Sequence, residues 1–322
     1  MPIHPPIRHR LTDRSTRAFA QASALLLLGF STAAPVAAQS APKAHLEQRV
    51  TDTAKMLEDH PHFKGRAAQE IEKGVEFVTG NTVFVLSHES GHALIAEMGI
   101  PVIGREEDGA DAFATIMALK MKNAFADRVL TSAARGWFLG DQRDKKDGMK
   151  TPYYDEHGID LERAYAIVCL MVGGEPDKYS PLADEVKIPA ERQGTCQGDY
   201  SNASWSWDKV LKPHQRTPEQ PKTKIDVTYG PGGEYESFAE MARKLRILEG
   251  VADHLSESYV WRTPIALEMQ VCGEPAAHWD LSTRKITVCY EIIWEFSQLY
   301  RHYGHLELVP ELDKKVLAKK RR

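Results

Sequence analysis

The chain has 322 residues, of which 42% are hydrophobic and 27% charged, with a formal net charge of −4. This is the composition of a soluble globular protein, and the length suffices for a sizeable core in one large domain or two ordinary ones. A mildly acidic chain is a poor candidate for binding nucleic acid, so we expect no such partner.

Residues 1–38 have the layout of a secretory signal peptide. Arginines precede the short apolar run "ASALLLLGF", and the small-residue stretch "APVAAQS" follows it. The apolar run is too short to span a bilayer easily, so we expect no stable membrane anchor. We expect cleavage near Ala38 and a secreted or periplasmic mature chain, 39–322, that forms a single domain. Losing four arginines and one aspartate with residues 1–38 would take the net charge from −4 to −7.

The mature chain reads as mostly helical, with a small antiparallel sheet or hairpin, which makes the expected fold class α+β. A turn is expected at "TGN", 79–81, and a long loop rich in proline and glycine at about 208–236. Alternating residues predict two short strands around the turn "LSTR", 281–284. Apolar periodicity predicts helices over 44–60, 65–78, 83–98, 105–125, 158–174, 237–258 and 291–303.

The four cysteines are Cys169, Cys196, Cys272 and Cys289. An exported protein can form disulfides, and four cysteines allow three pairings. The pairs closest in sequence, Cys169 with Cys196 and Cys272 with Cys289, are the ones we favour.

The stretch "VFVLSHESGHALIAEMGIP", 83–101, places two histidines four residues apart, with a glutamate directly after the first. At 100° per residue, His88 and His92 share one helix face and can reach one ion. Glu89 lies one residue round the helix, where it can take a proton from a water without being a ligand. This is the H-E-x-x-H motif of zinc peptidases. The alternative is an apolar helix that happens to carry two imidazoles.

The next helix supplies candidates for a third ligand in "REEDGAD", 105–111. Glu107 and Asp111 are four residues apart on one face, so Glu107 can ligate the metal while Asp111 orients a histidine through its second ring nitrogen. Glu106 and Asp108 remain rivals, since an acidic first turn also suits the helix dipole.

H-E-x-x-H followed by Glu-x-x-x-Asp on a second helix resembles the gluzincins, the thermolysin-type zinc peptidases. More closely, "HESGHALIAEMGIPVIGREEDGADAFATI", "DEHGIDLERAYAIVCLMVGGEP" and "VCGEPAAHW" with "ITVCYE" resemble a bacterial family of secreted metallopeptidase-like proteins of unknown function. The resemblance covers roughly residues 75–300. It implies a zincin-like fold and a zinc site at His88, His92 and Glu107, with Glu89 as the catalytic base.

Many zinc peptidases use a further histidine or tyrosine to stabilise the oxyanion. His157, in the polar segment "YYDEHGIDLERAY", is our candidate for a catalytic residue of this kind, and the alternative is a surface histidine. In gluzincins a substrate-lining strand precedes the metal helix, whereas the hairpin here comes about 190 residues after it. We still expect this hairpin to pack against the metal helix and line the cleft, because a peptide substrate needs an exposed strand edge. The alternative is a hairpin that only stabilises the fold and lies far from the metal.

The sequence therefore predicts a secreted metallopeptidase that hydrolyses peptide bonds with a zinc-activated water and has a peptide or protein as its substrate. Two alternatives stay open: a zinc amidase acting on a non-protein amide such as cell-wall peptide, and a non-catalytic zinc-binding protein. The oligomeric state is not indicated.

Overall fold

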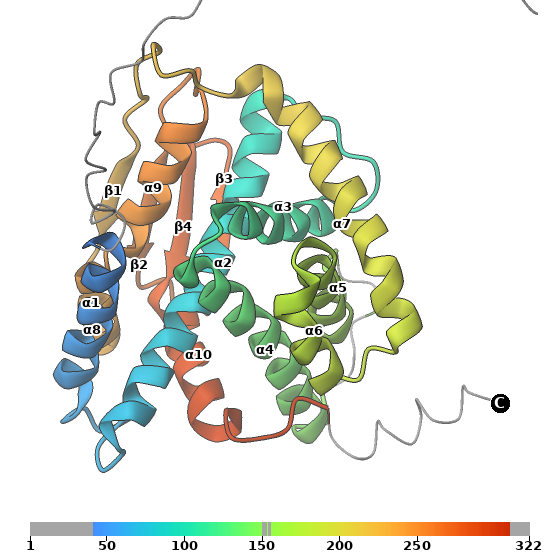
Figure 1. The fold of residues 1–322 in the computed structure, drawn as a ribbon. Helices are drawn as coiled ribbons and strands as arrows, with labels where there is room; N and C mark the ends of the chain where they lie inside the picture. The colour runs from blue at the N-terminus through green and yellow to red at the C-terminus, as the bar shows by residue number, and fades with distance from the viewer. Residues whose placement is uncertain (1–40, 150–152, 154–155, 310–322) are drawn as a thin grey trace, which may run out of the picture. The chain divides into compact units, whose positions relative to one another are not determined.

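The computed structural model describes residues 41–149, 153 and 156–309, and the expected signal peptide lies outside these residues. Helices dominate, and a small sheet forms late in the chain, so the helix-rich α+β fold is confirmed (Figure 1). The helices are α1 Ala41–Leu57, α2 Ala68–Met98, α3 Glu106–Met121, α4 Ala124–Lys146, α5 Asp160–Gly174, α6 Pro176–Glu185, α7 Ala190–Leu211, α8 Glu236–Leu245, α9 Ile247–Ser258 and α10 Tyr290–Tyr303. The strands are β1 Asp226–Tyr229, β2 Ala266–Gln270, β3 Ala277–Asp280 and β4 Lys285–Cys289. None of the described helices is long and apolar enough to cross a membrane.

Helix α2 runs unbroken for 31 residues and packs against α1, α3, α4, α10 and the β3–β4 hairpin. The prediction of a turn at 79–81 was wrong, because these residues lie inside α2. Thr79 donates its hydroxyl to the carbonyl of Val75 at 2.6 Å, and Asn81 donates to the carbonyls of Phe77 at 2.9 Å and Ser132 at 3.0 Å. These polar side chains are therefore satisfied inside the helix and by its neighbour α4, and they do not need a turn.

The sheet has the order β1-β2-β4-β3 and is mixed. Strands β1, β2 and β4 run parallel to one another, and only β3 and β4 pair in antiparallel fashion. The hairpin is therefore confirmed, but the expectation of an antiparallel sheet holds for it alone. Strand β1 falls within the loop expected at 208–236, and its four residues are too few to give a clear alternating pattern.

Two expected helices are shorter than their periodicity indicates. The one expected over 237–258 is two helices, α8 and α9, separated by Arg246 in the left-handed region at φ 56°. The one expected over 105–125 ends at Met121, because Asn123 caps the start of α4 by accepting a hydrogen bond from the backbone N–H of Ala126 at 2.9 Å.

The hairpin packs along the second half of α2. The backbone of Trp279 lies close enough to Glu89 to lower the pKa of its carboxyl group slightly against the effect of burial. Further along the same helix, Arg284 in the hairpin turn forms an ion pair with Glu97 at 2.7 Å. Two points of contact therefore hold β3 beside the part of α2 that carries the histidines.

Both predicted disulfides are confirmed. Cys169–Cys196 joins α5 to α7, and Cys272–Cys289 joins the segment after β2 to the end of β4. Gly173 allows the first pair of helices to approach, because a Cβ there would lie 2.2 Å from the carbonyl oxygen of Cys196.

Candidate metal centre

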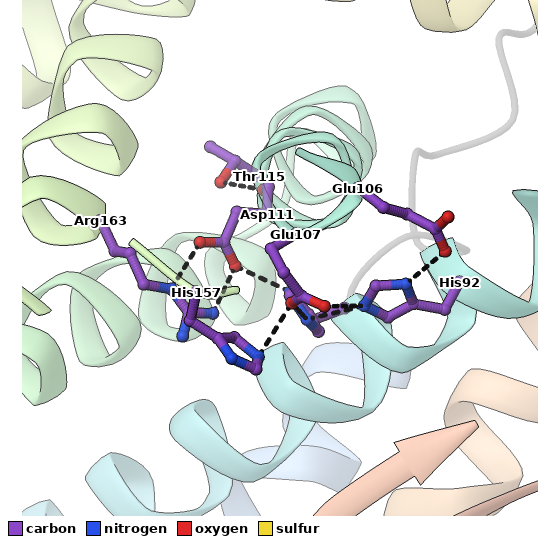
Figure 2. Close-up of polar contacts among 8 residues, drawn as sticks. His92, Glu106, Glu107, Asp111, Thr115, His157 and Arg163 are labelled. Carbon is purple, nitrogen blue, oxygen red and sulfur yellow. Dashed lines mark hydrogen bonds and ion pairs between the residues drawn. The ribbon is translucent and has the colours of Figure 1, made fainter. Parts of the chain in front are cut away.

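Close packing of α2 on α3 brings the predicted site residues together. Gly91, inside the H-E-x-x-H stretch, lies directly on Ala110, since a Cβ at Gly91 would be only 3.1 Å from the Ala110 Cα. At such a contact, side chains one turn away on each helix can meet across the interface. His88 and His92 thus face Glu107 at the start of α3. Figure 2 shows His92 and Glu107 turned toward each other.

The three predicted ligands form one cluster. The Nε2 atoms of His88 and His92 are 3.1 Å apart. Glu107 Oε2 lies 3.0 Å from His88 Nε2, and Glu107 Oε1 lies 3.4 Å from His92 Nε2. Two ligands held tetrahedrally at the usual zinc distances would be separated by about 3.3 Å. The spacing of these donor atoms therefore fits a small tetrahedral cation.

Each histidine is oriented by a carboxylate on its other ring nitrogen. His88 Nδ1 is 2.8 Å from Asp111 Oδ1, and His92 Nδ1 is 2.8 Å from Glu106 Oε1. These contacts assign the proton to Nδ1 in both rings and leave a lone pair on each Nε2. Two lone pairs 3.1 Å apart repel one another unless a cation lies between them, so the chemistry of the donor set also fits a metal.

Asp111 is itself held by a buried arginine. Arg163 donates from Nε and Nη2 to the two oxygens of Asp111, at 2.7 and 2.8 Å, and its guanidinium stacks on the Trp137 ring at 3.8 Å. Burial alone would raise the pKa of Asp111, but the hydrogen bonds from Arg163 and His88 outweigh it and lower the pKa to about 2. Asp111 thus stays an anion beside His88.

The carboxylates make the cluster favourable for positive charge. Burial opposes the charged form of His92, yet Glu107 and Glu106 outweigh it and raise its pKa to about 9. For Glu107, burial favours the neutral acid, but hydrogen bonds from His157, His88 and His92 hold its pKa far below the ordinary value. A proton and a metal ion compete for the same nitrogen lone pairs, so a site that stabilises one also stabilises the other.

Glu89 lies beside the cluster without joining the group of three donors found among the described residues. Its side chain is buried, and burial raises the pKa of its carboxyl group above the ordinary value. A carboxylate with a raised pKa is a better proton acceptor than one fully exposed to water.

His157 is also brought to the site. Its Nε2 lies 2.9 Å from Glu107 Oε2 (Figure 2). Its ring stacks at 6.4 Å from the ring of His88. The side chain of His157 is 41% exposed, against 6% for His88, so it stands at the solvent side of the cluster. Its role in stabilising an oxyanion stays a prediction.

Two participants carry no signal in the sequence pattern. Arg163 reaches Asp111 from 52 residues further along the chain, and Trp279 comes from the hairpin. Glu106, a rival ligand by its sequence position, instead orients His92. Helical periodicity relates residues within one element, so it does not reveal contacts made between elements far apart in the chain.

Comparison with family models identifies the family of the chain. The chain belongs to the DUF4344 family, described as "Putative metallopeptidase", whose model matches residues 46–211 and 232–320. No curated protein and no solved structure matches the chain.

Proposed function

We propose that this protein is an exported zinc metallopeptidase that hydrolyses peptide bonds. The observation that carries the proposal is the arrangement of three protein donors, two imidazoles and one carboxylate, with a buried glutamate next to them that is not a donor. Catalytic zinc sites have three protein ligands and an open position, whereas structural sites have four. Two disulfides agree with an oxidising compartment.

His88, His92 and Glu107 would hold the ion, and the mixture of imidazole and carboxylate donors suits zinc. When bound, zinc supplies a Lewis acid that polarises a substrate carbonyl and lowers the pKa of water. Asp111 and Glu106 keep both imidazoles in the tautomer and orientation that binding needs.

Glu89 is the proposed general base. It would accept a proton from the attacking water and pass it to the nitrogen of the leaving amine. The backbone of Trp279 lies beside this carboxylate.

The outer edge of β3 is the proposed binding surface for an extended peptide. Cys289 donates to the carbonyl of Ala276 at 2.9 Å, which makes that pair a hydrogen-bonded one. By alternation, the backbone groups of Ala277 and Trp279 point away from β4. Since the backbone of Trp279 lies beside Glu89, this edge would face the metal centre, and a peptide paired with it would pass the base.

His157 is the proposed donor to the developing oxyanion. Its exposed position beside Glu107 would let it turn toward a substrate carbonyl that approaches from solvent. This role depends on the metal site and can be tested separately, because the His157→Gln variant should keep its metal while its kcat falls.

The test is digestion of a peptide library by the purified protein, read by mass spectrometry, with the Glu89→Gln variant alongside. We expect Glu89→Gln to retain its metal and to lose activity by about 10²–10⁴-fold, because an amide cannot accept the proton. Glu72→Gln, at a half-buried position about five turns earlier on the same helix, is the matched control and should cleave normally.

Wild-type turnover by Glu89→Gln would refute the proposed base. A metal-loaded wild type that cleaves no peptide but hydrolyses cell-wall fragments would refute the peptidase and indicate an amidase of the same mechanism.

A further inference from the structure

A cavity of about 150 Å³ adjoins the metal centre on the same face of α2. It is lined by residues of α2, α4 and α10, with the first residue of α5 and one residue before β3. Its α2 lining includes Asn81 and Val85, which continue the stripe of His88 and His92 at spacings of four, three and four residues. At 100° per residue these four positions lie within about 60° of one another. The cavity therefore lies next to the metal ligands, about one turn toward the start of the helix.

The segment that carries His157 also joins the metal centre to this cavity. His157 lies against the metal cluster, and Asp160, three residues later, begins α5 and lines the cavity. Arg163, which holds Asp111, stacks on Trp137, and Trp137 is part of the cavity wall. The two sites thus share neighbouring residues.

The hairpin leads to the cavity from the other side. The backbone of Trp279 lies beside Glu89, and Arg284 in the turn pairs with Glu97, eight residues further along α2. Strand β3 therefore runs along α2 in the direction of the helix, and its start lies toward the cavity. Pro275, two residues before β3, lines the cavity. A peptide paired with the outer edge of β3 would reach the cavity at one end.

The walls of the cavity are mostly aromatic and aliphatic, and they include Phe84, Trp137 and Phe296. Sites for separate small molecules have volumes of about 300–1,000 Å³, so this cavity suits one side chain or one chain end. Aromatic faces attract cations, and the aliphatic stem of a lysine packs well on apolar surface. The walls are therefore compatible with an alkylammonium group.

Asp160 supplies a carboxylate without a partner. It makes no hydrogen bond or ion pair within the part of the chain that the structure describes, and neither of its oxygens is fully buried. Arg143, which also lines the cavity, is already paired with Asp144 at 2.9 Å and lies 3.7 Å from Glu295. Burial and the charge of Asp144 raise the pKa of Asp160 to about 6, although the nearby arginines oppose this. At pH 7 the cavity thus presents mostly an anion that lacks a counter-ion.

We propose that this cavity is a substrate subsite that takes an ammonium group of the peptide, with the ammonium hydrogen-bonded to the carboxylate of Asp160. The proposal rests on the peptidase activity proposed above. The ammonium belongs to a lysine side chain or to the free N-terminus of the peptide, which share the same chemistry. Its aliphatic part lies along Phe84 and Phe296. The substrates are therefore peptides with a cationic group on one side of the scissile bond.

Two variants test the subsite. Asp160→Asn keeps the size of the side chain and removes its charge. Gly140→Ala narrows the cavity at the carboxylate, because a Cβ there would lie 2.8 Å from Asp160 Oδ2. Asp177→Asn is the matched control, since Asp177 is exposed in the first turn of α6 as Asp160 is in the first turn of α5, and the effect on the helix dipole is the same. All three variants should retain their metal, because none alters a ligand.

The measurement is calorimetric binding of peptides to the zinc-loaded Glu89→Gln protein, in which cleavage should be lost. The probes are three alanine-based pentapeptides: one with both ends blocked and a central lysine, one with both ends blocked and a central norleucine, and one of alanine alone with a free N-terminus. We expect one of the two ammonium peptides to bind about 10–100-fold more tightly than the norleucine peptide, the value of a hydrogen bond to a charged group. The peptide that does so identifies the source of the ammonium. Adding Asp160→Asn should remove this preference, Gly140→Ala should reduce it, and Asp177→Asn should leave it unchanged.

Equal binding of all three peptides, or a preference that survives Asp160→Asn, would overturn the subsite. If the wild type still digests the peptide library, these outcomes leave the proposed peptidase activity intact. A wild type that digests no peptide would instead refute the peptidase activity, and the subsite with it.

Discussion

At the scale of single residues, Asp111 connects the metal centre to the interior of the protein through hydrogen bonds. It accepts from His88 on one side and from Arg163 on the other. Removing a carboxylate that orients a ligating histidine typically lowers the metal affinity 10–100-fold. The sequence indicates this role through the four-residue spacing from Glu107, but it does not indicate the arginine.

We predict that Asp111→Asn weakens metal binding by about 10–100-fold, because an amide accepts a weaker hydrogen bond from His88 Nδ1–H. Competition with a chelating dye measures the affinity, and circular dichroism confirms that the variant is folded. Asp108→Asn is the control on the same helix, since Asp108 is exposed and pairs only with Arg105 at 2.9 Å among the described residues. Equal affinities of wild type and Asp111→Asn would show that Asp111 has no such role.

His62 makes stability depend on pH. It is buried, lies 2.7 Å from the hydroxyl of Ser297 and faces the cations Arg66 and Arg301, with His60 nearby. Burial lowers its pKa from 6.5 to about 4. Between these values the unfolded chain binds a proton that the folded chain does not, so stability falls as the pH drops from about 6.5 toward 4.

We predict that the free energy of unfolding of His62→Gln decreases less between pH 7.0 and 4.5 than that of the wild type. The difference is at most about 3 kcal/mol, which is the free energy equivalent of the whole pKa shift of His62. Urea unfolding at pH 7.0, 5.5 and 4.5 measures the effect in wild type and variant. Parallel stability curves for the two proteins would show that the acid sensitivity arises from other groups.

At the scale of elements, the contact between α2 and α4 depends on glycine. A Cβ at Gly136 would lie 2.0 Å from Asn81 Oδ1, and one at Gly80 would lie 2.6 Å from the Ser132 Cβ. The polar stretch at 79–81 therefore belongs to a close helix crossing.

We predict that Gly136→Ala lowers the free energy of unfolding by about 1–3 kcal/mol, because the added methyl group forces the helices apart. Gly194→Ala should instead be neutral or stabilise by up to about 1 kcal/mol, since its Cβ meets open space and alanine favours the helix. Urea unfolding compares the two. A Gly136→Ala variant as stable as the wild type would contradict the close crossing.

The local sequence pattern predicted the elements whose own residues favour the structure that their surroundings require. It failed where contacts with other elements determine the secondary structure. The hairpin 277–289 and the helix 290–303 follow from alternation and apolar periodicity. The continuity of α2 through Thr79 and Asn81 depends on α4, and the break at Arg246 depends on one backbone conformation. Strand β1 pairs with β2, and the alternation in its four residues is too short to predict a strand inside a stretch rich in proline and glycine.

At the scale of the whole molecule, the site is assembled from three distant parts of the chain. Helices α2 and α3 supply the donors, residues 157–163 supply His157 and Arg163, and the hairpin places Trp279 beside Glu89. Two of the three donors could be predicted from their spacing on one helix and the third from the next helix. The surrounding partners could not, because only the fold brings them near.

Metal content tests the central claim most directly. The account predicts one zinc ion per chain in the purified wild type and in His302→Ala, which alters an exposed histidine away from the cluster. It predicts essentially none in His88→Ala or His92→Ala, because two ligands rarely retain zinc where three are needed. Elemental analysis by mass spectrometry, with circular dichroism to confirm folding, makes the measurement. Stoichiometric zinc in both histidine variants, or a folded wild type that binds no metal in zinc-containing buffer, would contradict the account.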